Sequence, residues 1–317
     1  MQKLKYSLSS QAEPEAMYLS ILIPTYNYNC TPLVTELAAQ AKRIVGLQWE
    51  IIVGDDGSTC NEVVAANRAI NSLPCCEYWE RGFNSGRAAI RNRLYERSRG
   101  RWLLFLDSDG MPVNSNFLAA YLAALQGLSA GAVCGSVAHP ATLPSPAVSL
   151  RWLHETTYAR RATVEWRNAH PYANFRTFNF LIHRDSFARV MFDEQVHSYG
   201  YEDNLFGRAL QDADVQVKHI DNPMMNVDIE ENAAYLAKNE EALRTLAAHY
   251  CTMGSLITLA QRVEKVERYH LGWLLSLVYT LFRPLLLRNL HGSAPRMWVF
   301  NLYRAGYLRA LLRKQVG

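Results

Sequence analysis

The chain has 317 residues, of which 49% are hydrophobic and 20% are charged, and its net charge is +4. This composition is that of a folded globular protein and excludes a disordered chain. The weak net charge excludes the concentrated basic surface of a dedicated nucleic-acid binder, so we expect no nucleic-acid partner. The six cysteines show neither CxxC nor zinc-ligand spacing, and we expect them to be reduced.

Residues 1–17 form a polar lead-in without the apolar run of a signal peptide, which predicts a cytosolic chain. Strands and helices then alternate: a strand over YLSILIPT, a helix over 31–45, a strand over WEIIVGDD, a helix over 86–99 and a strand over RWLLFLDSDG. A helix over 114–127, capped by Asn114 or Ser115, and the strand AGAVCGSV follow. These continuous apolar strands predict an α/β fold, Rossmann-like, with a mostly parallel sheet flanked by helices.

Residues 139–176 are rich in proline, arginine and aromatic residues and have no regular period, which predicts a long irregular segment or lid. Order resumes with a strand at FNFLIHRDSF, a helix that begins near Glu202 and a strand at DVQVKHIDNP. We therefore expect an α/β domain over 18–235 and a helical C-terminal extension over 236–317.

Two segments of the extension bear on membranes. YHLGWLLSLVYTLFRPLLLRNL is interrupted by Arg283 and Pro284 before it reaches the ~20 apolar residues of a spanning helix. MWVFNLYRAGYLRALLRK interleaves aromatic residues with arginines, a composition typical of helices that lie in the membrane interface. We expect these helices to attach the chain to a membrane surface. The alternative is that both pack against the α/β domain.

Acidic residues stand at three places where strands end or a helix begins: Asp55 and Asp56, Asp107 and Asp109, and Glu202 and Asp203. Any one group alone is explained by turn or cap chemistry. Ligands of such sheets bind at the carboxyl ends of the strands, so acidic tips from two strands at one edge favour a site. Carboxylates spaced like Asp107 and Asp109 suit Mg²⁺ or Mn²⁺ bridging a diphosphate.

The ordered motifs SILIPTYN, GDDGS, FNSGRAAIRN, WLLFLDSDG, FNFLIHRDSF and YGYEDNLFGRAL resemble the family 2 glycosyltransferases, over about residues 18–230. The resemblance implies a GT-A fold and an inverting, metal-dependent transfer of a sugar from a nucleoside-diphosphate sugar to a hydroxyl of a glycan or lipid-linked acceptor. Together with the amphipathic C-terminal helices, it favours assembly of a bacterial surface polysaccharide or lipopolysaccharide at the inner face of the cytoplasmic membrane. The alternatives are a non-catalytic relative that binds sugar nucleotides or acts as a scaffold, and, less favoured, a sugar nucleotidyltransferase.

The resemblance assigns roles to individual residues. It places the donor against Pro24, Thr25, Tyr26, Asp55, Asp56, Asn84, Arg87, Arg91, Asp107 and Ser108, although a solvated helix face would also explain the two arginines. It makes Asp109, with Asp107, a ligand of Mn²⁺ or Mg²⁺. Asp203 becomes the general base, and Glu202 orients either the acceptor or a neighbouring side chain.

One position departs from the family pattern. Many relatives carry a metal-binding histidine where this chain has Asn226, whose carbonyl oxygen can still serve as a ligand. The nearby His219 is expected to be a structural strand residue. Trp152, Trp166 and Tyr172 are candidates to stack on acceptor sugars, with simple packing as an equal alternative.

Overall fold

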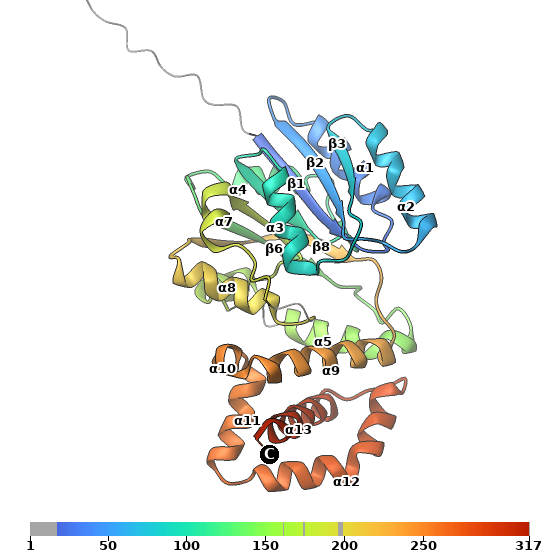
Figure 1. Cartoon of the computed structure of the whole chain (residues 1–317), viewed down its shortest axis with the longest axis vertical. Helices are drawn as coiled ribbons and strands as arrows, with labels where there is room; N and C mark the ends of the chain where they lie inside the picture. Colours follow the sequence, from blue (N-terminus) through green and yellow to red (C-terminus); the bar gives the residue numbers. More distant parts are fainter. Residues whose placement is uncertain (1–17, 161, 174, 196–198, 317) are drawn as a thin grey trace, which may run out of the picture.

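The computed structural model describes residues 18–160, 162–173, 175–195 and 199–316, so the predicted lead-in over 1–17 lies outside them. Within the described residues the centre of the fold is an eight-stranded sheet in the order β3-β2-β1-β4-β7-β6-β8-β5 (Figure 1). The strands are β1 Tyr18–Thr25, β2 Gln48–Asp55, β3 Cys76–Glu80, β4 Trp102–Leu106, β5 Gly110–Pro112, β6 Ala132–Ala138, β7 Asn179–His183 and β8 Val217–Asn226.

Strands β1 to β4 run parallel to one another, as do β6 and β8. β7 is antiparallel to both of its neighbours, and the edge strand β5 is antiparallel to β8. The register pairs Thr25 with Asp55 and Leu22 with Phe105, so β1, β2 and β4 end at the same edge of the sheet. The predicted α/β class with a mostly parallel sheet is confirmed, and the antiparallel strands β5 and β7 add to it.

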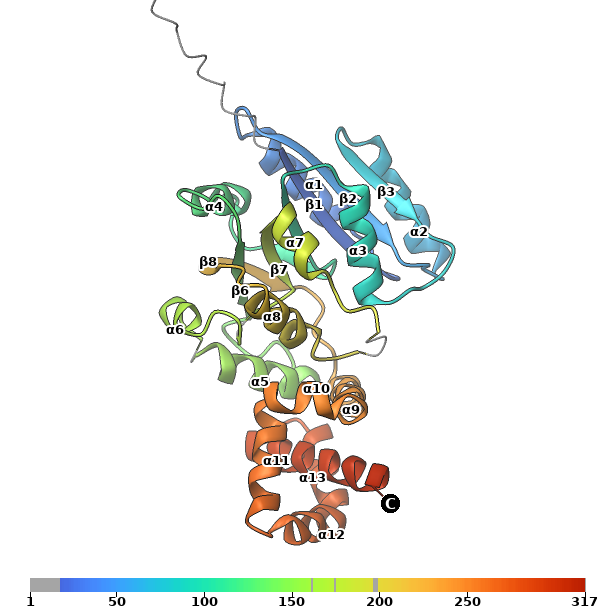
Figure 2. The same cartoon turned by 60° about the vertical axis from the view of Figure 1, so that its left-hand side comes forward.

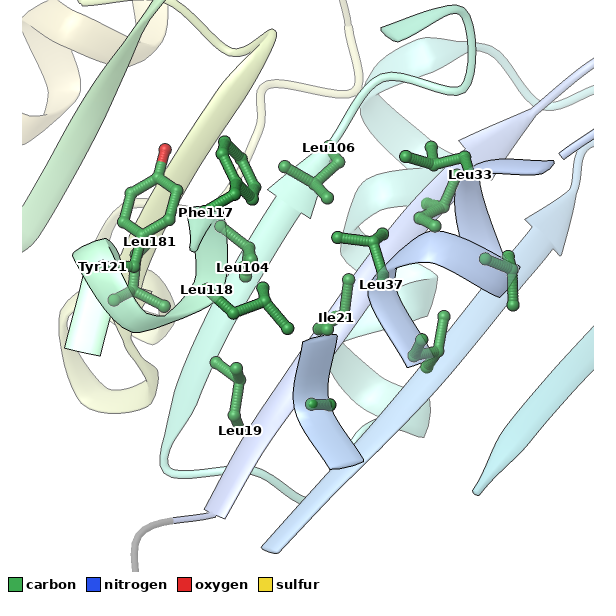
Figure 3. Close-up of a cluster of buried hydrophobic side chains, with 14 of the residues drawn as sticks. Leu19, Ile21, Leu33, Leu37, Leu104, Leu106, Phe117, Leu118, Tyr121 and Leu181 are labelled. Atoms are coloured by element: carbon green, nitrogen blue, oxygen red, sulfur yellow. The ribbon is translucent and has the colours of Figure 1, made fainter. Parts of the chain in front are cut away.

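Helices cover both faces of the sheet (Figures 1 and 2). The helices are α1 Thr31–Lys42, α2 Asn61–Arg68, α3 Arg87–Arg97, α4 Phe117–Ala124, α5 Ser149–Ala159, α6 Val164–Ala169, α7 Arg184–Val190, α8 Glu202–Asp212, α9 Asn232–Ala248, α10 Tyr250–Met253, α11 Thr258–Arg268, α12 Gly272–His291 and α13 Met297–Val316. Because successive side chains of a strand point to opposite faces, Ile21 and Leu22 of β1 enter different apolar clusters. Figure 3 shows the first cluster, where Leu37 of α1 and Leu118 of α4 pack over the sheet.

Two predictions of local structure are wrong. The segment 139–176 contains the regular helices α5 and α6. Helix α5 buries Leu150 among the C-terminal helices, whereas α6 packs against β8, so the two helices do not share one apolar face. Helix α4 begins after Asn116, whose side chain makes no capping hydrogen bond. Its Leu118 N–H instead donates to Oε1 of Gln40 in α1, at 3.1 Å, so a neighbouring helix supplies the cap.

The C-terminal helices form a group of their own at the lower end of Figure 1. Helices α9, α12 and α13 pack against one another, and the boundary expected after residue 235 falls inside α9. Two apolar clusters hold this group together, and they also include Leu150 of α5 and, partly buried, Tyr201 and Leu205 at the start of α8. No single described helix has both the length and the apolar character to span a membrane, although α11 and α12 together meet that test with a bend of 115°.

Helix α12 leaves one side uncovered. Large apolar side chains that are more than two-fifths exposed follow one another along it: Trp273, Leu274, Leu277, Leu281, Phe282 and Leu285. Helix α13 differs, because its Phe300, Tyr303 and Leu308 are buried against the neighbouring helices. Packing therefore accounts for α13 and for one side of α12, and the other side of α12 stays apolar and open.

Candidate functional site

Two arginines of α3 hold Asp107 at the end of β4. Arg91 pairs with Oδ1 of Asp107, and Arg87 Nη2 lies 3.3 Å from Oδ2. Arg91 is only 2% exposed, so the solvated-face alternative is wrong for this residue. Burial raises the pKa of Asp107, and the two guanidinium groups oppose that rise. The pairing fixes the direction of this carboxylate before any ligand binds.

Arg87 also connects β4 to α8. Its Nε lies 3.2 Å from Oε1 of Glu202, in the first turn of α8, and its side chain is about half exposed. The acidic tips of β4 and α8 therefore meet at one guanidinium group. A guanidinium in this position can also donate to an anionic ligand.

Asp109 lies against the end of β8. Asn226 Nδ2 donates to Asp109 Oδ2 at 2.9 Å, and the Val227 N–H donates to the Asp109 carbonyl at 2.9 Å. The register of β5 on β8 causes this contact, because it pairs Gly110 with Asn226. The Asn226 Oδ1 atom is buried and has no hydrogen-bond partner among the described residues. One carboxylate and one unpartnered carbonyl oxygen therefore lie side by side.

The Asp109 carboxylate and the Asn226 carbonyl oxygen fit a divalent cation that prefers oxygen ligands and takes only a few of them from the protein. Within the described ranges no group of three or more His, Cys, Asp and Glu side chains is arranged to hold a metal. Mg²⁺ needs no such group, since it usually takes one or two carboxylates and completes its shell with water and substrate phosphates. His219 is not available as a further ligand, because its Nε2 is 2.8 Å from the Pro171 carbonyl and its Nδ1 is near Arg167.

Asp203 lies in the first turn of α8, after the left-handed residue Tyr201. Its Oδ1 accepts two hydrogen bonds from Thr177, from the backbone N–H at 3.1 Å and from Oγ1 at 2.5 Å. Thr177 precedes β7, so no local sequence pattern connects it with α8. Both bonds go to one oxygen, and the second oxygen of Asp203 has no hydrogen-bond partner among the residues that the structure describes.

Asp55 and Asp56 are buried and already bonded within the protein. Asp55 accepts from the Tyr78 hydroxyl and, at 2.7 Å, from the Ser58 N–H. Asp56 accepts from the backbone N–H groups of Ser85, at 3.0 Å, and Gly86, at 2.8 Å. These bonds shape the end of β2 and the loop that carries Asn84, whose Oδ1 accepts from Gly86.

The other expected donor residues lie at the same edge. Pro24 and Thr25 end β1, and Thr25 is buried beside Asp55. Tyr26 follows with about half of its side chain exposed, and Ser108 lies in the turn between β4 and β5. The carboxyl edge of the sheet thus collects these residues with the two aspartate pairs.

The aromatic residues of segment 139–176 do not gather at one place. Trp152 donates its indole N–H to the Pro140 carbonyl at 2.9 Å, and Tyr172 packs against the apolar cluster that contains Leu22. Trp166 is exposed on α6, and its ring contacts that of His170 at a tilt of 36°. The packing alternative therefore describes Trp152 and Tyr172.

Two residues near the acidic tips were not predicted. The centre of the Tyr199 ring is 5.4 Å from the Arg87 guanidinium and 5.8 Å from the ammonium of Lys238 in α9. Burial lowers the pKa of Lys238, and Arg151 and Arg87 lower it further. Helix α9 thus brings a cation to the site from a segment assigned by sequence largely to the extension.

Comparison with known proteins decides the family. The model of glycosyl transferase family 2 matches residues 20–191, which is more than half of the chain. The chain belongs to this family.

Among proteins of known sequence, this family 2 chain is similar to a dolichyl-phosphate beta-glucosyltransferase of Saccharomyces cerevisiae, with 28% identity over 116 residues, which is 33% of each chain. It is also similar to an uncharacterized glycosyltransferase of Haemophilus influenzae, with 31% identity over 96 residues, 30% of this chain and 38% of the relative. The chain therefore matches only about a third of the length of these relatives.

A solved structure resembles the whole family 2 chain in fold. It is the mannosyltransferase PcManGT of Pyrobaculum calidifontis, in complex with GDP-Man and Mn²⁺, with a TM-score of 0.54 and 14% identity over 96% of this chain and 90% of that one. The predicted GT-A fold is confirmed by this likeness. Of the candidate residues, Asp107 and Asp109 lie within the family match, whereas Glu202, Asp203 and Asn226 lie beyond it.

Proposed function

We propose that this chain is an inverting, metal-dependent glycosyltransferase that moves a sugar from a nucleoside-diphosphate sugar to a hydroxyl of a glycan or lipid-linked acceptor. The observation that carries the proposal is the cluster in which Arg87 contacts both Asp107 at the end of β4 and Glu202 at the start of α8. In this cluster the aspartates proposed to bind the metal and the diphosphate lie close to Asp203, the candidate base, which follows Glu202 in a family 2 chain.

The donor lies along the carboxyl edge of β1, β2 and β4. Thr25 and Tyr26 line the nucleotide side, and Asp55 and Asp56 shape it. The half-exposed Arg87 donates to the diphosphate while it keeps its contacts with Asp107 and Glu202. Ligands of open α/β sheets bind at this edge.

Asp109 and Asn226 hold Mn²⁺ or Mg²⁺, with Asp107 beside them. The unpartnered Oδ1 of Asn226 supports this assignment, because a buried carbonyl oxygen without a donor suits a cation. When bound, the cation offsets the charge of the diphosphate.

Asp203 acts as the general base. It accepts the proton of the acceptor hydroxyl, whose oxygen forms a bond to the anomeric carbon as the bond to the diphosphate oxygen breaks. Attack from the face opposite the leaving group inverts the configuration. The Thr177 bonds to Oδ1 of Asp203 leave the second oxygen for the hydroxyl, and Glu202, held by Arg87, orients the acceptor.

The uncovered side of α12 attaches the protein to the inner face of the cytoplasmic membrane. Leu274, Leu277, Leu281 and Leu285 follow at spacings of three and four residues, which places them on one stripe. Residues 258–317 contain ten lysines and arginines but two glutamates, so the other residues together are net negative. An apolar stripe within a basic segment suits a surface of anionic lipids.

The membrane assignment predicts the behaviour of a neutral double variant, Leu277→Gln with Leu281→Gln. Each leucine contributes roughly 1.5 kcal/mol or more when buried in lipid, so we expect at least about a hundredfold weaker binding to phosphatidylglycerol vesicles in co-sedimentation. Val45→Gln, at a fully exposed valine beyond α1, is the matched control and should bind like the wild type. Unchanged binding of the double variant would show that α12 does not face the membrane.

The proposed reaction is tested by donor hydrolysis and binding across UDP-, GDP- and TDP-sugars with Mn²⁺ or Mg²⁺. We expect slow, metal-dependent release of one nucleoside diphosphate by the wild type. Asp109→Asn keeps an oxygen that accepts from Asn226 and removes the charge, so it should lose this release without unfolding. If the chain binds a donor with metal but turns it over neither alone nor with added acceptor mixtures, it is a non-catalytic relative. If it synthesises a sugar nucleotide from a nucleoside triphosphate, it is a nucleotidyltransferase.

A further inference from the structure

An open hollow of about 750 Å³ lies at the carboxyl ends of β6 and β8, beside the edge strand β5. Its walls come from three segments, 111–113, 140–148 and 225–229. Most of its lining is aliphatic, including Met111, Val113, Pro144, Met225, Val227 and Ile229. The same edge of the sheet carries the acidic cluster.

The hollow is continuous with the candidate metal site. Asn226 lines it and donates to Asp109, and the neighbouring Val227 binds the Asp109 carbonyl through its N–H. An occupant of the hollow therefore lies one residue away from the carboxylate that faces the donor diphosphate. An acceptor has to approach the donor sugar, which is attached to that diphosphate, so a hollow beside Asp109 is within reach of part of an acceptor.

The lining selects the chemistry of the occupant. Among the described residues that line the hollow itself none is aromatic and none is Lys or Arg, and the polar side chains are those of Ser145, Asn226 and Asp228. A saccharide would leave most of its hydroxyl groups without hydrogen bonds there. A phosphate group would meet Asp228 and no lining cation. An uncharged aliphatic chain leaves no polar group unpaired and buries apolar surface.

We propose that this hollow binds an uncharged aliphatic part of the acceptor, so that the reacting hydroxyl follows the chain directly, without a charged linker between them. The inference rests on the proposed function and narrows its acceptor to a neutral amphiphile. Affinity should increase with chain length, by roughly fourfold for each CH₂ group that becomes buried.

The test uses the full-length protein and a long-chain alcohol that carries an alkyl diazirine. After photolysis, the labelled peptides are mapped by mass spectrometry. We expect label in 111–113, 140–148 and 225–229, displaced by 1-dodecanol and far less by 1-butanol. Val113→Gln with Val227→Gln makes the wall polar at two partly exposed positions, and should lower this labelling by roughly tenfold or more, unlike Val45→Gln.

Two results would overturn the inference. One is label confined to α12 or spread evenly over the chain, which would show that the probe binds the membrane-facing surface. The other is equal labelling of the hollow in the wild type and the double variant. Displacement by methyl glycosides as effective as by 1-dodecanol would show a saccharide site instead. The probe carries neither sugar nor nucleotide, so labelling is read apart from donor hydrolysis on the same sample. Donor hydrolysis without labelling of the hollow would contradict this inference alone. Labelling of the hollow without donor hydrolysis would contradict the proposed reaction.

Discussion

Asp203→Asn is expected to lower kcat for sugar transfer by roughly 10²- to 10⁴-fold, the usual contribution of a positioned general base. The asparagine Oδ1 can still accept both Thr177 bonds, so the start of α8 keeps its position. What the side chain loses is the ability to take a proton from the acceptor. Donor affinity should therefore stay within about twofold of the wild type, because the base touches the acceptor and not the nucleotide.

Steady-state kinetics with the donor chosen by the hydrolysis panel separate kcat from KM, and thermal denaturation reports the fold. Asp212→Asn is the matched control, because this exposed aspartate lies at the other end of the same helix and pairs with Arg208. Its kcat should equal that of the wild type. A retained rate in Asp203→Asn would remove Asp203 as the base, and a lost rate with a large fall in Tm would make its role structural.

The sheet could be predicted from the sequence because its information is local. A strand buried on both faces is a continuous apolar run, and Ile21, Leu22 and Ile23 form such a run whichever face each of them takes. The polar residues directly after the strands then had to lie at one edge. Hence Asp55 and Asp107 could be placed at a common edge without coordinates.

The supporting contacts could not be predicted, because they join residues far apart in the chain. Gln40 caps α4 from α1, Thr177 holds Asp203 from the segment before β7, and Lys238 reaches the site from α9. Each depends on how two elements pack, and no period or motif records that packing. The same holds for the irregular pattern of segment 139–176, which conceals α5 and α6.

For the C-terminal extension, too, only local features could be predicted. The sequence predicted its helices and its aromatic and basic composition. It could not predict which helix exposes apolar side chains: in α13 Arg309 is buried and pairs with Glu267, whereas α12 exposes its leucines. Composition alone gives both helices similar chances to face lipid, and packing distinguishes them.

The candidate metal site predicts opposite effects of two substitutions at Asn226. Asn226→Ala removes the unpartnered oxygen, so we expect Mn²⁺ to bind roughly tenfold more weakly in calorimetry with the nucleoside diphosphate present, about 1.4 kcal/mol. Asn226→Asp places a second carboxylate beside Asp109 and should bind Mn²⁺ more tightly. Without the cation, two neighbouring carboxylates repel each other, so the same variant should lose stability that Mn²⁺ restores.

The opposite signs distinguish ligation from simple support of the fold. If Asn226 served only to hold Asp109 through the 2.9 Å hydrogen bond, Asn226→Ala and Asn226→Asp would both lose that donor and would weaken Mn²⁺ binding alike. Asn301→Asp is the control for an added carboxylate, since this asparagine is exposed on α13, away from the sheet. Tighter binding by Asn226→Asp alone would therefore identify position 226 as a metal ligand, because no effect on folding predicts a gain.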